Sequence, residues 1–135
     1  MTFYSKERQY EGSNWNPFIP TRRDIKRTNK LAGKNPIIVG ALVFLFPVGA
    51  IVYLNRIENF LKFLAYFIII SLTIVIMFGV YVVINKDKGY EEISKVAQVY
   101  DSMINIVYLL SRIAVTVESI RAVTLASKRQ SERNF

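Results

Sequence analysis

The sequence contains no cysteine and no histidine. Without cysteine the chain has no disulfide, no thiolate nucleophile and no cysteine-based metal site. Without histidine it lacks the commonest general base and the commonest ligand of transition metals. The sequence also shows no glycine-rich phosphate-binding loop, no paired-carboxylate site and no metal-binding cluster. We therefore expect that the protein is not an enzyme, that it binds no cofactor or metal, and that it has no small-molecule substrate.

Acidic residues are scarce in a chain that is otherwise strongly apolar. Hydrophobic residues make up 52% of the 135 residues, and 18 Lys and Arg accompany 10 Asp and Glu, which gives a net charge of +8. These properties conflict in a soluble protein of this size. They agree when the apolar residues lie in lipid and the charges lie at its edges. The composition therefore predicts an integral membrane protein of single-domain length.

Two long stretches without charge predict membrane-spanning helices. The expected elements are a first span at 37–54, a turn at 55–62 and a second span at 63–84, which together form a transmembrane helical hairpin over 35–84. The turn is too short to hold a domain, so the two spans would be antiparallel neighbours. Pro47 lies in the first span and cannot donate to the carbonyl of Val43, so we expect a kink there.

The segment before the first span is basic. Residues 21–34 are predicted to form a short juxtamembrane helix, because Thr21 and Asp24 have the spacing of a capping box and Gly33 and Pro36 end the helix. Its cations would be attracted to anionic lipid headgroups by about 1 kcal/mol per charge. The expected headgroup contacts are Arg22, Arg23, Lys26, Arg27, Lys30 and Lys34. A pure topology signal is the alternative interpretation, and we do not expect binding to nucleic acid.

Residues 1–20 show no helical or strand periodicity and are predicted to be an extended or disordered arm. Its aromatic residues would order on a partner or at the lipid interface, or the arm would remain a mobile tail. These aromatic residues are Tyr4, Tyr10, Trp15 and Phe18. Eight Lys and Arg precede the first span and two lie in the turn. The positive-inside rule then places both termini on the cytoplasmic side, or on the stromal or matrix side of an organelle.

A long amphipathic helix is predicted over 90–129, followed by a tail at 130–135. Its apolar residues recur at alternating intervals of three and four, a period typical of coiled coils. The expected partner-helix contacts are Val99, Met103, Ile106, Leu110, Ile113 and Val117. A centred arginine such as Arg112 costs about 2.5–3.5 kcal/mol on insertion. We therefore favour a helix at the membrane interface, or paired with a partner helix, over a third span. If this helix does span, Arg112, Glu118 and Arg121 must face protein. Glu118 and Arg121 have the spacing of a helix-surface pair.

A short motif runs through the first span and the turn. Its residues are Lys34, Asn35, Pro36, Pro47, Gly49, Tyr53, Leu54 and Arg56. The segment 34–64 resembles a family of small two-pass transmembrane hairpin domains, which have Asn-Pro at the start, a Pro/Gly break and a Tyr-Leu-Gly-Arg loop. Asn55 stands here in place of the loop glycine. The resemblance implies the hairpin, with Pro47, Gly49, Tyr53 and Arg56 at its kink and turn, and implies no particular activity.

The sequence thus predicts an all-α integral membrane protein, a two-helix hairpin followed by a long amphipathic C-terminal helix. We expect an accessory, assembly or scaffold subunit of a larger membrane protein complex, which acts through the C-terminal helix and the N-terminal arm. Its expected partners are anionic membrane lipids and either such a complex or further copies of the chain. A membrane-shaping hairpin is the main alternative. A small oligomeric channel or carrier is less favoured, because both predicted spans lack ionisable residues.

Overall fold

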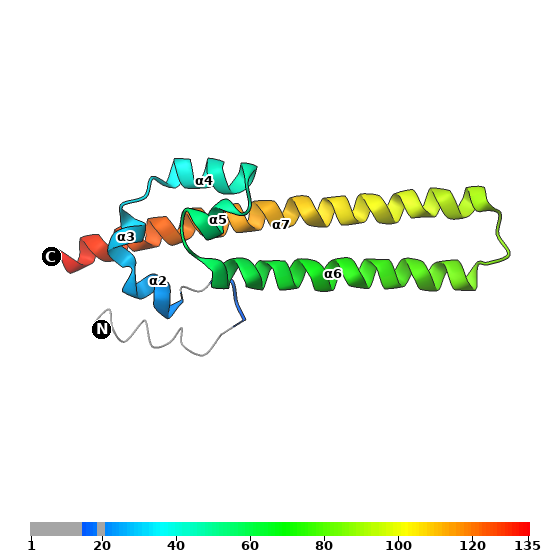
Figure 1. The fold of residues 1–135 in the computed structure, drawn as a ribbon, viewed down its shortest axis with the longest axis horizontal. Coiled ribbons are helices and arrows are strands. Elements are labelled where there is room, and N and C mark those ends of the chain that lie inside the picture. Colours follow the sequence, from blue (N-terminus) through cyan, green and yellow to red (C-terminus); the bar gives the residue numbers. More distant parts are fainter. Residues whose placement is uncertain (1–14, 19–20) are drawn as a thin grey trace. The chain divides into compact units, whose positions relative to one another are not determined.

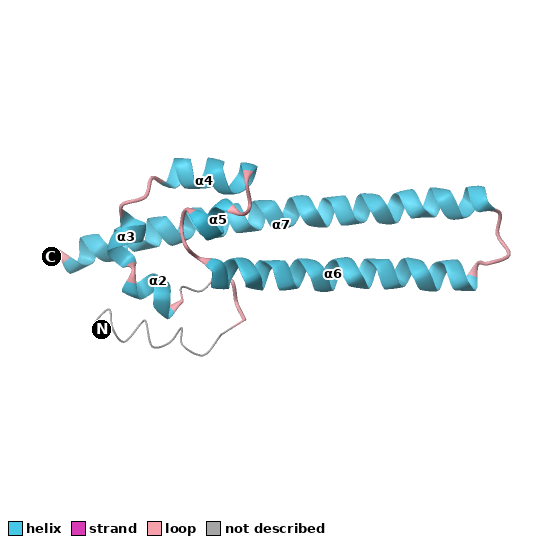
Figure 2. Cartoon of the chain, viewed as in Figure 1, coloured by secondary structure: helices cyan, strands magenta, loops and turns pink. Residues whose placement is uncertain are grey.

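The computed structural model describes residues 15–18 and 21–135, and all the regular structure in this described part is helical (Figures 1 and 2). The helices are α2 (Arg22–Lys26), α3 (Thr28–Ala32), α4 (Pro36–Leu45), α5 (Gly49–Val52), α6 (Ile57–Ile84) and α7 (Tyr90–Arg133). The predicted all-helical fold with a long C-terminal helix is confirmed. Most of the predicted arm, including Tyr4 and Tyr10, lies outside the described residues.

The chain forms two compact units. The first contains Met1–Phe63 and Arg112–Phe135, and the second contains Leu64–Ser111. Because α6 and α7 are long, each contributes residues to both units. The core of the first unit includes the buried side chains of Leu31, Val39, Val43, Leu54, Phe63, Val115, Val123 and Ala126.

The second unit is a helical hairpin, in which residues 85–89 connect the end of α6 to the start of α7 (Figure 1). The less exposed side chains recur on α7 at Ile93, Ala97, Tyr100, Ile104 and Val107, and on α6 at Phe67, Ser71, Ile74, Phe78 and Tyr81. Ring contacts join the two helices, with centroids 5.2 Å apart for Phe78 and Tyr100, which belong to these rows, and 6.1 Å apart for Phe67 and Tyr108, which lies beside the α7 row. We call these two rows the hairpin seam. Its steps of three and four residues are those of helices packed along their length.

Both long helices are long and apolar enough to cross a membrane. In the second unit α6 exposes many large apolar side chains, among them Ile68, Ile69, Leu72, Val75, Ile76 and Val80. A helix that is apolar around most of its circumference is suited to lipid rather than water. These features indicate a membrane protein. They also give α7, which we expected to lie at the interface or against a partner, the length and composition of a span.

The first predicted span, 37–54, is not a single helix. The helix α4 ends at Leu45, and only the four-residue helix α5 follows the break at 46–48. The cause is Pro47, because a proline disfavours the helical conformation in the residue before it. Phe46 is accordingly extended, with φ −130° and ψ 92°. The expected kink is therefore a complete break.

The ten residues of α4 reach about 15 Å, which is half of a hydrocarbon core of about 30 Å. The predicted turn at 55–62 is also shorter than expected. Because α6 already begins at Ile57, only residues 53–56 connect it to α5.

Candidate functional site

A buried ion cluster lies at the centre of the first unit. Arg56 Nε and Nη2 donate to the two carboxylate oxygens of Asp24 at 3.0 and 2.7 Å. Its Nη1 and Nη2 donate to the carboxylate of Glu118 at 2.5 and 2.7 Å. All three residues are at most 4% exposed. A planar guanidinium suits this arrangement, because its fixed fork of donors matches a carboxylate on each side.

Asn59 extends the cluster. Its Nδ2 donates to Glu118 Oε1 at 3.3 Å and to the carbonyl of Pro17 at 2.9 Å. Close by, the ring of Phe18 meets the ring of Phe63 edge to face at 5.7 Å. Of the four aromatic residues predicted to dock, the structure describes Phe18, which contacts its own chain at Phe63, and Trp15; their exposed fractions are 38% and 72%.

Asp24 and Arg56 are both charged at neutral pH. Burial alone would raise the pKa of Asp24, but the hydrogen bonds and the charge of Arg56 outweigh burial and hold that pKa below its usual value. Burial alone would lower the pKa of Arg56, but both carboxylates together raise it. One cation thus joins α2, the connection before α6, and α7. Removing one partner of such a buried pair leaves an uncompensated charge, which costs about 3–5 kcal/mol.

A small recess borders the cluster. Its lining residues are Phe18, Asp24, Arg56, Glu118, Arg121, Ala122, Leu125 and Arg129. Its volume of about 10 Å³ is far below the range of about 300–1,000 Å³ that is usual for ligand pockets. The donors and acceptors of the cluster are directed at one another. The arrangement therefore suits a structural role more than the binding of a substrate.

Sequence reasoning found only part of this cluster. The predicted capping box is present, because Asp24 N donates to Thr21 Oγ1 at 3.1 Å and Thr21 N donates to Asp24 Oδ2 at 3.3 Å. The predicted pairing of Glu118 with Arg121 is wrong. Glu118 faces the interior and binds Arg56, whereas Arg121 is exposed. The one available signal was the presence of Glu118 inside an apolar stretch.

Arg112 stabilises the break after α4. Its Nε donates to the carbonyl of Phe44 at 3.0 Å, and its Nη2 donates to the carbonyls of Phe44 and Leu45. These carbonyls belong to the last turn of α4, so no backbone N–H of the same helix donates to them. The guanidinium also lies 5.2 Å from the centroid of the Phe44 ring. Arg112 and Glu118 therefore face protein, as a spanning α7 would require, and Arg121 does not.

The two ends of the α4–α5 segment are held close together. Arg27 Nη1 donates to the carbonyls of Leu54 and Asn55 at 3.2 and 3.1 Å. The ammonium of Lys34, just before α4, lies 4.1 Å from the centroid of the Tyr53 ring, just after α5. Asn55 has a left-handed φ of 51°, which turns the chain into α6.

The remaining residues of the predicted kink also have structural roles. Gly49 is buried at the start of α5, and a Cβ there would lie 3.1 Å from Leu42 Cγ. Pro47 breaks the helix, Tyr53 contacts Lys34, and Arg56 belongs to the ion cluster.

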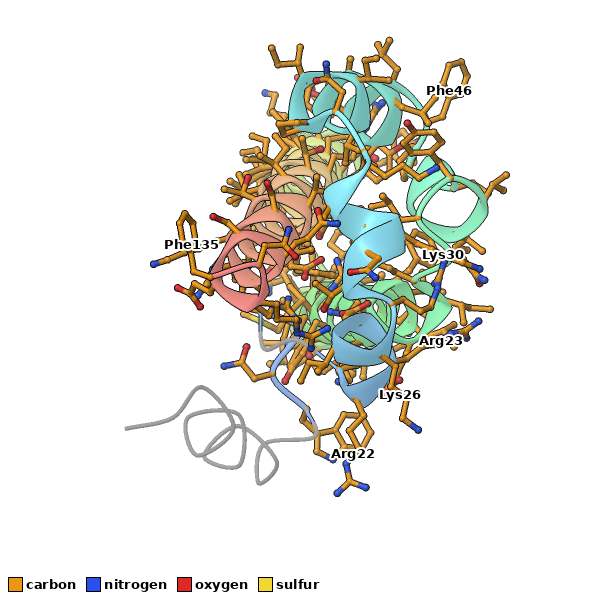
Figure 3. The ribbon with its side chains drawn as sticks, turned by 90° about the vertical axis from the view of Figure 1, so that its left-hand side faces the viewer. Arg22, Arg23, Lys26, Lys30, Phe46 and Phe135 are labelled. Carbon is orange, nitrogen blue, oxygen red and sulfur yellow. The ribbon has the colours of Figure 1, made fainter. Side chains whose placement is uncertain are left out.

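The six predicted headgroup residues fall into two groups. Arg27 and Lys34 are half-buried and contact the connection before α6. Arg22, Arg23, Lys26 and Lys30 are exposed along the outer side of α2 and α3 (Figure 3). Between residues 12 and 57 the only acid is Asp24, which faces inward to Arg56. The outer side of α2 and α3 is therefore cationic.

The predicted partner contacts of α7 are exposed. In the second unit, Val99, Met103, Ile106 and Leu110 have exposed fractions between 40% and 59%. We call these four residues the α7 stripe. It differs from the hairpin seam by one position along the helix, which is about 100° around its axis. In the first unit, Ile113 and Val117 are exposed as well.

Comparisons with known proteins identify no relative. No family model matches the chain, and no curated protein or solved structure matches it. The resemblance of residues 34–64 to two-pass hairpin domains thus gains no support from these searches.

Proposed function

We propose that the protein is a non-catalytic accessory or scaffold subunit of a larger membrane protein complex, and that the α7 stripe is its docking surface. The observation that carries this proposal is the exposure of the stripe beside a hairpin seam that is already occupied. A second apolar row with coiled-coil spacing suits a second helix.

The chemistry of α7 favours a protein partner over lipid. The second unit also exposes Gln98, Asp101, Ser102 and Asn105 on α7, where Asn105 Nδ2 donates to Asp101 Oδ2 at 3.3 Å. Polar side chains in spanning helices usually face other protein, because acyl chains leave their hydrogen bonds unmade. In contrast, α6 exposes mainly apolar side chains in this unit, which suits lipid.

The proposed topology has α6 and α7 as the two spans. Both termini then lie on the cytoplasmic or equivalent side, and residues 85–89 lie on the other side. That connection carries two lysines and one aspartate, whereas basic residues are frequent before α6 and after residue 111. The distribution agrees with the positive-inside rule. A docking role for the N-terminal arm stays a prediction, because most of the arm lies outside the described residues.

The test is the native mass of the protein after extraction in a mild detergent. We compare wild type with a variant that carries Ile106→Ala and Leu110→Ala, which shortens the α7 stripe without adding charge. The matched control carries Leu72→Ala and Ile76→Ala on α6. Both pairs are four residues apart, and the wild-type side chains are 57% and 59% exposed in the stripe and 56% and 58% exposed in the control.

We expect wild type and the α6 control to migrate with a large assembly, and the stripe variant to migrate apart from it. A wild-type protein that migrates alone or as a small homo-oligomer would contradict the proposal and favour membrane shaping or transport. Unchanged migration of the stripe variant would contradict the docking role of α7.

A further inference from the structure

We infer that α4 and α5 form a re-entrant segment that enters and leaves one leaflet of the membrane from the same side, and that α2 and α3 contact its anionic headgroups. The inference rests on the membrane location in the proposed function. It adds a lipid-binding surface in the first unit that is separate from the α7 stripe.

The path of the chain is the first argument. Lys34, two residues before α4, and Tyr53, the residue after α5, are neighbours, because the Lys34 ammonium lies over the Tyr53 ring at 4.1 Å. Arg27, from the connection between α2 and α3, binds the carbonyls of Leu54 and Asn55. A segment whose two ends are joined in this way cannot have its ends on opposite sides of a bilayer.

The depth of the segment is the second argument. With a length of about 15 Å, α4 is too short to cross a hydrocarbon core of about 30 Å. The break at 46–48 leaves carbonyls without helical partners, and non-helical backbone is tolerated at membrane depth only where protein satisfies it. Arg112 supplies that partner by donating to the carbonyls of Phe44 and Leu45. This contact also gives an arginine in an apolar stretch a protein partner.

The two faces of α4 differ in what they contact. Val39, Gly40 and Val43 are buried, and a Cβ on Gly40 would lie 2.7 Å from Ile120 Cδ1, so this face packs closely against α7 within the first unit. The opposite face and the break expose large apolar side chains, including Ile37, Ile38, Phe44, Leu45, Phe46 and Val48. An apolar patch of this kind is unfavourable in water and suits acyl chains.

The charge of the surface formed by α2 and α3 indicates which lipid headgroups it contacts. Figure 3 shows Arg23, Lys26 and Lys30 on α2 and α3 on the same side of the first unit as Phe46. The acid nearest to them in sequence, Asp24, faces inward to Arg56, and among the described residues no ion pair joins these three cations to a carboxylate. A cationic edge beside an inserted apolar segment is complementary to anionic headgroups.

Single-cysteine labelling tests the path. Because the chain has no cysteine, all maleimide labelling of a single-cysteine variant comes from the engineered position. Asn29→Cys and Glu58→Cys bracket the segment, and Lys86→Cys lies in the connection between α6 and α7. In sealed membranes, a membrane-impermeant maleimide should label the first two from one side and the third from the other. Labelling of Asn29→Cys and Glu58→Cys from opposite sides would overturn the inference. Labelling of all three from one side would overturn the membrane location itself.

Fluorescence tests the depth. The chain has one tryptophan, so Phe46→Trp is made in a Trp15→Phe background, with Phe135→Trp as the control. In phosphatidylcholine vesicles with brominated acyl chains, we expect strong quenching of Phe46→Trp and little quenching of Phe135→Trp. Equal, weak quenching of both variants would overturn insertion of the segment, whatever the outcome of the native-mass experiment.

Lipid selectivity tests the headgroup contact. We expect spin-labelled phosphatidylserine to be immobilised in preference to phosphatidylcholine, and the preference to decrease when Lys26→Gln is combined with Lys30→Gln. The matched control combines Lys86→Gln with Lys88→Gln and should change the preference less. A preference that is absent, or that both double variants reduce equally, would overturn the anionic-headgroup part of the inference.

Discussion

At the residue scale, Arg56 is the side chain on which two buried carboxylates depend. Replacing it with methionine keeps much of the side-chain volume but leaves Asp24 and Glu118 buried together without a cation. We expect Arg56→Met to lower the free energy of unfolding by about 3–5 kcal/mol. Denaturant unfolding in detergent micelles measures the change. The exposed Lys26→Met is the control and should change stability by about 0.5 kcal/mol or less. Equal effects of the two variants would contradict the role of the cluster.

The pKa of Asp24 gives the cluster a pH dependence with a definite sign. Because Arg56 lowers the pKa of Asp24 in the folded state, the carboxylate contributes stability above its unfolded-state pKa of about 3.9. That contribution is lost as the pH falls through the folded-state pKa. We expect the stability difference between wild type and Asp24→Asn to be largest near neutral pH and to shrink below about pH 4. Unfolding curves measured across this range test the prediction, and a constant difference would contradict it.

The residues of the cluster were predictable only one at a time. Asp24 was identified as part of a capping box and Arg56 as part of a turn, because both signals are local. Their pairing joins positions 32 residues apart, and Glu118 lies 62 residues beyond Arg56. No periodicity links positions so distant, because their approach depends on how the helices pack. The left-handed conformation of Asn55, in contrast, had a local signal, because the resembling family has a glycine at this position and glycine adopts a positive φ readily.

At the element scale, Arg112 completes the broken end of α4. Replacing it with glutamine removes the charged donors to the carbonyls of Phe44 and Leu45. We expect Arg112→Gln to destabilise the first unit by about 1–3 kcal/mol, the cost of leaving such groups unsatisfied. The exposed Arg121→Gln on the same helix is the control and should have a smaller effect. Thermal unfolding of both variants measures the difference, and a larger loss in the control would contradict the capping role.

The elements themselves were predicted better than their packing. Length and apolar content located α6, the spacing of apolar residues located α7, and Pro47 indicated an interruption in the first apolar stretch. However, α7 carries two apolar rows with the same spacing, one beginning at Ile93 and one at Val96. Periodicity does not distinguish a row that packs within the chain from a row that stays exposed. That choice depends on the side chains of α6, which meet α7 through Phe67 and Phe78.

At the scale of the whole molecule, a substitution that destabilises one unit should affect the other unit less. The ion cluster lies in the first unit, whereas the ring contacts of the hairpin seam lie in the second. Compact units often open independently. We expect Arg56→Met to speed amide hydrogen exchange in α2, α3 and α4 more than in residues 64–111. Exchange followed by mass spectrometry tests this, and a uniform increase along the chain would indicate one cooperative unit.

Composition predicted the membrane location but not the path of the chain. An uncharged stretch such as 37–54 has the same composition whether it crosses a bilayer or returns to its starting side. What distinguishes the two paths is a set of contacts at the ends of the stretch, including Lys34 with Tyr53 and Arg27 with Leu54. These contacts join residues from different elements, so a reading of each segment by itself does not reveal them.

The ion cluster also has a consequence for the order of events during synthesis. Asp24 leaves the ribosome before Arg56, and Glu118 follows 62 residues after Arg56. The nascent chain therefore holds an Asp24–Arg56 pair of zero net charge first, and the second carboxylate arrives only when most of α7 has been made. We expect chains arrested before residue 118 to leave one side of the guanidinium without a carboxylate, exposed to quality control. The ion cluster of the first unit would then be complete only after the Glu118 part of α7 has been synthesised.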